Sequence, residues 1–362
     1  MYDCAVLSDH DLASGSLAAA SEPGTPDSAT RDVLSDVLRT VRLTGALFFL
    51  VDASAPWVIE VPAGTALARV ILPRSQVVIS YHVVKRGACW GAVAGGAPVR
   101  LGPGDVLVFP HGDPYVMSID RAMRGGPDSA EVLSFMRQMS RGDLPFTVSE
   151  GGGGAERMDL LCGFLGCDVR PFNPLLAALP RLLHVQRSAR STGDSLDQLL
   201  EFTVAESREK RAGGECVRLR LSELMFVEVV RRHLDSLPVE HTGWLAGLRD
   251  ETVGRALGLL HERPAHDWTL EGLARETGLS RSALADRFSH FVGQPPMQYL
   301  TRWRLQLAAR LLADGTAKVS GVALEVGYDS EAAFSRAFKK VTGIPPAAWR
   351  QRHAAHASTS QR

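Results

Sequence analysis

Cysteine is scarce in this sequence, and its scarcity excludes one kind of scaffold. The 362 residues include only Cys4, Cys89, Cys162, Cys167 and Cys216. An odd and sparse set in a chain of this size does not make a disulfide framework and is typical of reduced intracellular thiols. Long apolar runs are also missing, so no segment is predicted to span a membrane. The first 20 residues lack the basic start of a secretory signal, and the sequence therefore predicts a cytoplasmic protein.

An excess of one charge is absent as well, because 40 basic residues balance 40 acidic ones. This balance hides an asymmetry along the chain. Residues 248–362 carry 13 Arg and 3 Lys against 11 acidic residues, a net charge of +5, while the remainder carries 24 basic and 29 acidic residues, a net charge of −5. The C-terminal part is therefore the part suited to a polyanion, although so small an excess does not by itself establish nucleic-acid binding.

The length of the chain predicts two domains with terminal tails, because a single core rarely grows so large. Residues 1–30 are rich in Ser, Ala, Pro and Gly and are predicted to be disordered, and residues 31–39 to form a short helix. From residue 41 to about Phe146, short apolar runs are cut by Gly and Pro, which favours a β-sandwich or barrel. The predicted strands include 46–51, 77–84, 106–109 and 115–119.

Helices are predicted after a flexible glycine-rich break at Gly151–Gly154. They cover 174–185, 195–209 and 221–237, and the last carries an apolar stripe of Leu221, Leu224, Met225, Val229 and Leu234. An amphipathic stripe does not say what covers it, so packing on the β core and dimerisation both remain open. A linker is predicted next, and the chain beyond it is strongly helical to about Arg352.

The C-terminal part contains an internal repeat with a spacing of about fifty residues. The first copy runs from Trp268 to Phe288 and closes with Gly293-Gln-Pro-Pro296, and the second runs from Val319 to Phe338 and closes with Gly343-Ile-Pro-Pro346. In both copies a small alanine, Ala274 or Ala323, precedes a glycine, Gly278 or Gly327. The alanine lets a second helix cross closely, and the glycine ends the first helix because it adopts a positive φ without steric cost.

Capping residues complete the pattern of two helix-turn-helix motifs. Ser280 in the first copy, and Asp329 or Ser330 in the second, can cap the helix that follows the turn. A helix, a short turn with glycine and a second helix is the layout of this motif, and the Pro-Pro pairs stop each second helix. Between the copies, residues 297–312 are predicted to form one uninterrupted helix that fixes the spacing of the motifs.

The second helix of each motif divides into a core face and an outward face. In the first, Leu284, Phe288 and Phe291 are predicted to face inward, and in the second, Phe334, Ala337, Phe338 and Val341. The candidates for base contacts in a major groove are Arg281, Ser282, Ala285, Asp286, Glu331, Ala332, Ser335 and Arg336. The candidates for phosphate contacts are Arg302, Arg304, Lys339 and Lys340. The two helices could enter successive major grooves about 34 Å apart.

These motifs resemble one family closely. Residues 250–352 are similar to the DNA-binding domain of the AraC/XylS regulators, above all in the run Gly327-Tyr-Asp-Ser-Glu-Ala-Ala-Phe-Ser-Arg-Ala-Phe-Lys-Lys-Val-Thr-Gly-Ile-Pro-Pro346. Tyr81-His-Val-Val, Gly87-Ala-Cys-Trp90 and the segment Gly104–Tyr115 resemble the cupin-like N-terminal domain of one subgroup. The resemblance implies that Ser282, Ala285 and Asp286 face bases in the first motif, and Ala332 and Arg336 in the second.

The cupin resemblance raises the question of a metal, which such domains hold through His and Glu ligands. Tyr115 stands where the second cupin motif would place a histidine, and the first motif offers only His82. Two isolated histidines, His82 and His111, do not make a metal site, so we predict no cofactor and no enzyme activity. His82, His111 and Tyr115 instead stay weak candidates for contact with a small-molecule effector. A metal-dependent cupin enzyme fused to a DNA-binding module is the competing hypothesis.

Cys162 and Cys167 allow one further alternative, a redox sensor, although buried structural cysteine is the commoner case. The prediction is an α+β protein: a disordered tail (1–30), a cupin-like β-barrel with helical extension (31–237), a linker (238–248), an all-α double helix-turn-helix domain (249–353) and a second disordered tail (354–362). We expect a regulator that binds double-stranded promoter DNA in a sequence-specific manner. RNA polymerase, a small-molecule effector and a second copy in a homodimer are further candidate partners.

Overall fold

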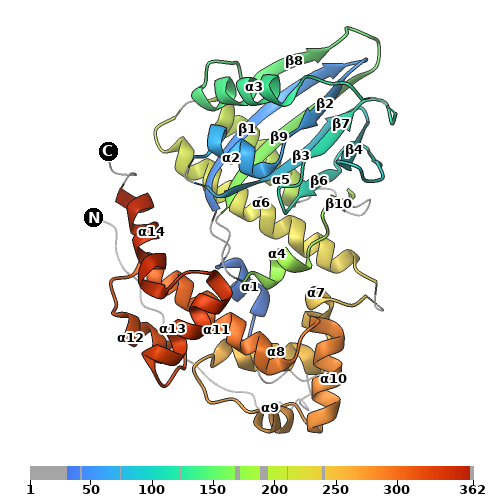
Figure 1. Cartoon of the computed structure of the whole chain (residues 1–362). Coiled ribbons are helices and arrows are strands. Elements are labelled where there is room, and N and C mark those ends of the chain that lie inside the picture. Colours follow the sequence, from blue (N-terminus) through green and yellow to red (C-terminus); the bar gives the residue numbers. More distant parts are fainter. Residues whose placement is uncertain are drawn as a thin grey trace, which may run out of the picture.

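The computed structural model describes residues 31–40, 43–73, 75–122, 124–167, 172–187, 195–209, 211–238 and 241–358, and in Asp314 and residues 354–358 the backbone alone. Two domains are evident, with a sheet-rich domain above a helical one in Figure 1. The predicted tail at 1–30 lies outside the described residues, and so do residues 359–362 of the second predicted tail. Among the described residues, no helix combines the length and the apolar character that a membrane span requires.

The N-terminal domain is built on two sheets that face each other (Figure 1). The larger has the strand order β10-β6-β3-β9-β1-β8, and the smaller has the order β2-β7-β4-β5. The larger sheet contains β1 (Leu43–Ser54), β3 (Val77–Arg86), β6 (Val106–Phe109), β8 (Thr147–Gly151), β9 (Arg157–Cys167) and β10 (Leu183–Val185). The smaller contains β2 (Val58–Val61), β4 (Cys89–Val93), β5 (Val99–Leu101) and β7 (Tyr115–Ser118). The predicted α+β class with a cupin-like N-terminal domain is confirmed.

Two helices of this domain were not predicted. Helix α2 (Gly64–Ile71) follows β2, and α3 (Ser129–Arg141) packs against both α2 and β2. Asp128 caps α3 and forms a reciprocal capping box with Glu131, and Gly142 ends the helix at φ 76°. Such local signals explain why α3 forms, even though it lies inside a stretch rich in strands.

The prediction that the sheet region ends near Phe146 is wrong. Strand β9 follows it and lies at the centre of the larger sheet, where it pairs antiparallel with β1 on one side and β3 on the other. From Leu160 to Cys167 its residues are buried on both faces, so this part of its sequence lacks the alternation that marks a half-exposed strand. The glycine-rich stretch before it is not a break between domains, because the backbone of Gly152 and Gly154 bonds to Pro56 and Ala55.

The helical extension is partly as predicted. Helix α4 (Pro174–Ala178) is shorter than expected, because the chain turns before Pro180 and enters β10. Helices α5 (Ser195–Arg208) and α6 (Gly214–Ser236) pack on each other, and α6 also contacts β1 and β10. Of the predicted stripe, Leu221, Met225 and Val229 are buried, while Leu224 is 53% exposed. Helix α6 therefore covers the β core, which was one of the two alternatives for it.

The C-terminal domain is all helical, as predicted (Figure 1). Its elements are α7 (Trp244–Arg249), α8 (Glu251–Glu262), α9 (Leu270–Glu276), α10 (Arg281–Val292), α11 (Pro296–Asp314), α12 (Val319–Glu325), α13 (Glu331–Thr342) and α14 (Pro346–Ser358). Helix α7 begins inside the predicted linker, and its Trp244 and Leu245 are buried. The second Pro of each Pro-Pro pair is the first residue of the next helix, α11 or α14, because proline suits that position.

Apolar packing divides the molecule into three clusters that do not coincide with the two domains. One cluster lies between the two sheets. A second runs from the outer face of the larger sheet through α5 and α6 to α1 (Val33–Leu38), α4 and the first helix-turn-helix unit, where it ends at Trp303. The third belongs to the second unit and includes Leu305, Phe334 and Phe338. The N-terminal half of α11 thus packs in one cluster and its C-terminal half in another.

Candidate nucleic-acid interface

The first helix-turn-helix motif consists of α9, a turn and α10. Thr269 caps α9 by accepting a hydrogen bond from the Gly272 amide, and Gly278 takes φ 72° in the turn. Ser280 then caps α10 by accepting from the Ala283 amide at 3.2 Å. Gly293, at φ 75°, ends the helix. Each of these residues is a local signal, which is why the motif was predictable from the sequence alone.

The second motif repeats this arrangement with α12, a turn and α13. Gly327 takes φ 84°, and a Cβ placed there would lie 2.8 Å from the Cα of Ala265, so only glycine fits without a shift. Of the two capping candidates, Ser330 is the one used, since it accepts from the Ala333 amide at 3.2 Å. Phe334 and Phe338, on the inner face of α13, are completely buried.

Most of the predicted base-contacting side chains are exposed on α10 and α13. Ala285 and Ser335 are half-buried, and the exposed residues are Arg281, Ser282, Asp286, Glu331, Ala332 and Arg336. A shallow hollow lies at the start of α10 beside Arg281, Ser282 and Ala285. Lys339 and Lys340 are exposed near the end of α13. Val341 differs from the prediction, because it is 39% exposed rather than packed inward.

Arg304, predicted as a phosphate contact, has three backbone partners within the protein. Its Nε donates to the carbonyl of Pro264 at 2.6 Å, and its Nη2 donates to the carbonyl of His266 at 2.7 Å. Its Nη1 donates to the carbonyl of Gly327 at 3.1 Å. One guanidinium on α11 therefore joins the loop before the first motif to the turn of the second. We call this set of contacts the Arg304 clamp.

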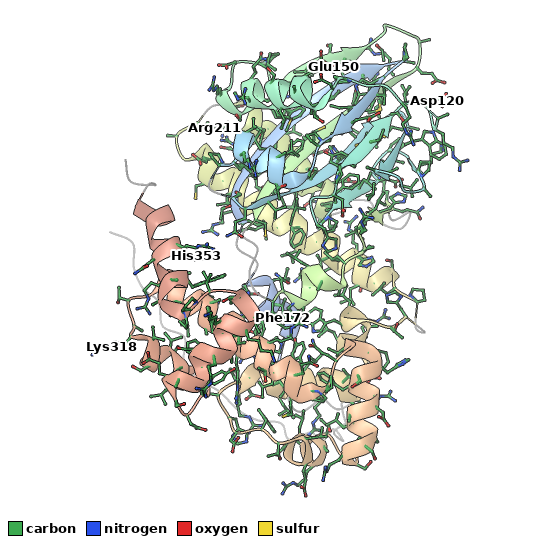
Figure 2. All side chains as sticks on the ribbon, in the orientation of Figure 1. Asp120, Glu150, Phe172, Arg211, Lys318 and His353 are labelled. Carbon is green, nitrogen blue, oxygen red and sulfur yellow. The ribbon has the colours of Figure 1, made fainter. Side chains whose placement is uncertain are left out.

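Arg302, another phosphate candidate on α11, also has partners within the protein. Its guanidinium lies 4.5 Å from the centre of the Phe172 ring and bonds to Gln294. Phe172, labelled in Figure 2 where the two domains meet, donates its amide to Gln306 Oε1 at 3.1 Å. The ring also packs edge-on against Tyr299. Arg302 thus holds a segment of the N-terminal domain on α11. Of the four phosphate candidates, Lys339 and Lys340 are the two with exposed side chains.

A buried polar cluster lies at the same junction. His261 on α8 is stacked on Trp303 and its Nε2 lies 2.8 Å from the Tyr299 hydroxyl. Burial lowers the pKa of His261 to about 3, so the ring is neutral near pH 7. Asp36 on α1 lies 3.9 Å from its Nδ1 and pairs with Arg31 and Arg39. No sequence signal marked this contact between α1 and α8, because its partners are more than 200 residues apart.

The structure brings two of the three effector candidates together and leaves the third apart. The Nε2 of His82 lies 2.7 Å from the Tyr115 hydroxyl, and its Nδ1 lies 3.3 Å from Cys162 Sγ. Burial lowers the pKa of His82 to about 3. His111 instead bonds to the carbonyl of Leu179. Within the described ranges, no three His, Cys, Asp or Glu side chains gather as metal ligands would.

Cys162 and Cys167 lie on the same strand, β9, but on opposite faces of the sheet. Cys162 belongs to the cluster between the sheets, and Cys167 belongs to the cluster beneath α5 and α6. Five residues along a strand span about 16 Å, whereas a disulfide needs Cα atoms within about 7 Å. Cys162 and Cys167 therefore cannot form a disulfide with each other, which excludes that form of the redox-sensor alternative.

Two facing sheets joined to a pair of helix-turn-helix motifs form the architecture expected of a transcription regulator. A family model described as cupin matches residues 32–235, and one described as a helix-turn-helix domain matches residues 273–352. A protein of Streptomyces lividans described as an AraC-like transcription regulator is 34% identical over 327 residues, which cover 88% of this chain and 98% of that protein. The chain belongs to this family of AraC-like transcription regulators.

Two further proteins are similar to this chain. The transcriptional regulator AlkR of Acinetobacter baylyi is 28% identical over 88% of this chain and 99% of its own length. The crystal structure of the DNA-binding domain of AdpA in complex with a target DNA is 29% identical, covers 29% of this chain and 95% of that one, and has a TM-score of 0.28. The two family models and the Streptomyces lividans relative confirm the family and the function predicted from the sequence.

Proposed function

We propose that this regulator controls promoters by placing α10 and α13 in successive major grooves on one face of double-stranded DNA. The observation that supports this most is the pair of recognition helices, each with a fully buried aromatic face and an exposed polar face. The shared helix α11 and the Arg304 clamp support a fixed spacing between them. The proposal places this activity in the cytoplasm and assigns no chemical step to the chain.

The two motifs would contribute unequally to base discrimination. On α13, Arg336 is an exposed guanidinium that can donate two hydrogen bonds to a guanine. On α10, Ala285 offers only a methyl group, and Asp286 can accept from cytosine but repels phosphate. Lys339 would contact phosphate and add affinity without sequence information. We therefore assign most of the base discrimination to Arg336.

Arg336→Ala is expected to weaken binding to a preferred duplex by about 1–3 kcal/mol, because a lost bidentate contact to a base costs that much. The preferred duplex is obtained by selection from random DNA with the full-length protein, and affinities are then measured by fluorescence anisotropy. The variant should also lose its preference at a single base position. Equal affinity and an unchanged selected sequence would remove Arg336 from the base-reading set.

Lys339→Ala provides the matched comparison on the same helix. If Lys339 contacts phosphate, its loss weakens binding to the selected duplex and to a scrambled duplex by the same factor, and lowers the slope of log K against log salt by about 1. A loss confined to the selected duplex would contradict that assignment.

The N-terminal domain is proposed to adjust DNA binding to a small-molecule effector, and homodimers and contact with RNA polymerase are further parts of the proposal. Phe202 on α5 and Leu224 on α6 are large apolar side chains left 55% and 53% exposed. They supply a surface that a second copy could cover. Sedimentation equilibrium of the wild type and of Leu224→Glu tests this: a monomer in both cases rejects the dimer.

A further inference from the structure

A cavity of about 430 Å³ lies in the N-terminal domain, beside α3 and the inner face of the larger sheet. Its size falls within the range of about 300–1,000 Å³ that small-molecule sites occupy. Three phenylalanines form much of one wall: Phe49 stacks on Phe164 and meets Phe135 of α3 edge-on. Trp57, Met117 and Met136 extend this apolar lining. The walls therefore favour a ligand with a large apolar surface.

The polar groups of the cavity are few, and three of them already bond to one another. His82, Tyr115 and Cys162 all line it, and the two ring nitrogens of His82 are taken by the other two side chains. The three side chains come from β3, β7 and β9 and are buried. Because burial holds the pKa of His82 near 3, the ring carries no charge near pH 7. This row of hydrogen bonds gives the cavity a neutral polar end.

Charged groups in the lining are restricted to one sign. Glu131 and Glu150 line the cavity, and the Glu131 carboxylate accepts from the amide of Asp128 in the capping box of α3. None of the described residues that line it is an Arg or a Lys. An anionic ligand would therefore lose its hydration without gaining a cation, which costs several kcal/mol. The same desolvation cost applies to a cation at the end formed by His82 and Tyr115.

We propose that this cavity binds an uncharged, mainly aromatic small molecule whose single polar group bonds to the Tyr115 hydroxyl, which His82 holds in place. The inference rests on the proposed regulation by an effector and specifies the chemistry of that effector.

Neighbouring residues on β3 connect the cavity to the rest of the molecule. Tyr81 and Val83 flank His82 and point to the opposite face of the sheet, where Tyr81 reaches Met225 of α6. That face belongs to the apolar cluster that continues into the first helix-turn-helix unit.

The test uses four probes that share one ring system: 1-naphthol, naphthalene, 1-naphthoate and 1-naphthylmethylammonium. Isothermal titration of the full-length protein should give one site for 1-naphthol, with 1-naphthoate and the ammonium probe each at least about tenfold weaker. Val132→Phe, which fills the cavity from α3, should abolish 1-naphthol binding. Tyr115→Phe should weaken 1-naphthol about threefold to tenfold, as expected for one lost hydrogen bond, and leave naphthalene unchanged. Glu201→Ala, at an exposed position on α5, is the control and should bind 1-naphthol like the wild type.

Two results overturn the inference: 1-naphthoate binding as tightly as 1-naphthol, or no binding of either uncharged probe up to about 1 mM by protein that still binds DNA. A preference for 1-naphthol over naphthalene that survives Tyr115→Phe would overturn the assigned hydrogen bond to Tyr115. DNA affinity, measured separately with and without 1-naphthol, distinguishes this inference from the proposed function. Selective 1-naphthol binding with unchanged DNA affinity supports the ligand class and rejects regulation through this site. Absence of specific DNA binding both with and without 1-naphthol rejects the proposed function alone.

Discussion

Acidification from about pH 7 to about pH 5 is expected to destabilise the protein by about 4 kcal/mol, because two buried histidines must gain a proton on unfolding. Burial lowers the pKa of both His82 and His261 to about 3, against an ordinary value of 6.5. A depressed pKa in the folded state means that the unfolded chain binds more protons in this window. The stabilisation is therefore complete above pH 6.5 and is lost progressively as the pH falls toward 3, by about 2 kcal/mol for each histidine at pH 5.

Urea unfolding at several pH values checks this result, with variants that separate the two sites. His261 is faced by Tyr299, Trp303, Asp36 and Arg31, and His82 by Tyr115 and Cys162. His261→Gln or His82→Gln should each remove about half of the pH dependence, since glutamine does not titrate. His290→Gln, at an exposed position on α10, is the control and should leave the pH dependence of the free energy of unfolding unchanged. A free energy of unfolding that stays constant from pH 7 to pH 5 would contradict the prediction.

Arg304→Met is expected to cost about 2–3 kcal/mol of stability, because three carbonyls lose a charged donor and the site is only half-buried. DNA binding should fall by about tenfold or more, because the loop before the first motif and the turn of the second are no longer held by one side chain. Arg304→Lys should have an intermediate effect, since an ammonium cannot reproduce the fork of a guanidinium.

Arg310→Met is the matched control, because Arg310 is on the same helix but is exposed. It should lose little stability, and its DNA affinity should remain close to that of the wild type. Stability is read from urea unfolding, and affinity from anisotropy with the selected duplex. If Arg304→Met and Arg310→Met weakened DNA binding equally while both proteins kept their stability, the clamp would be rejected and phosphate contact would be favoured for Arg304.

The helix-turn-helix motifs could be predicted because their signals are short-range. Ser280 accepts a hydrogen bond from an amide three residues away, and Gly278 and Gly327 each act through their own φ. Helices α2 and α3 were not predicted because they lie in a stretch dominated by strands, although the capping box of α3 is itself a local signal. Strand β9 was not predicted because burial on both faces removes the alternation on which strand prediction depends.

The parts of the site that the sequence did not predict depend on residues that meet only in the folded chain. The clamp needs the carbonyls of residues 264, 266 and 327, and a carbonyl leaves no mark in the sequence. From the sequence, Arg304 was therefore predicted only as a phosphate contact, without its partners within the protein. His82 and Tyr115 were suspected from the cupin resemblance, but Cys162 joins them from a strand 80 residues away. Whether two histidines form a site is likewise decided by topology, which separates His111 from His82.

The division of α11 between two apolar clusters determines where the molecule can open without unfolding completely. Helices α8, α9 and α10 share a core with α1, α4 and α6, so their amides should exchange with solvent only when contacts to the N-terminal domain also break. Helices α12, α13 and α14 have a core of their own and can fluctuate as a separate cooperative unit. A signal from the N-terminal domain would thus reach α10 through a shared core, and would reach α13 only through α11 and the Arg304 clamp.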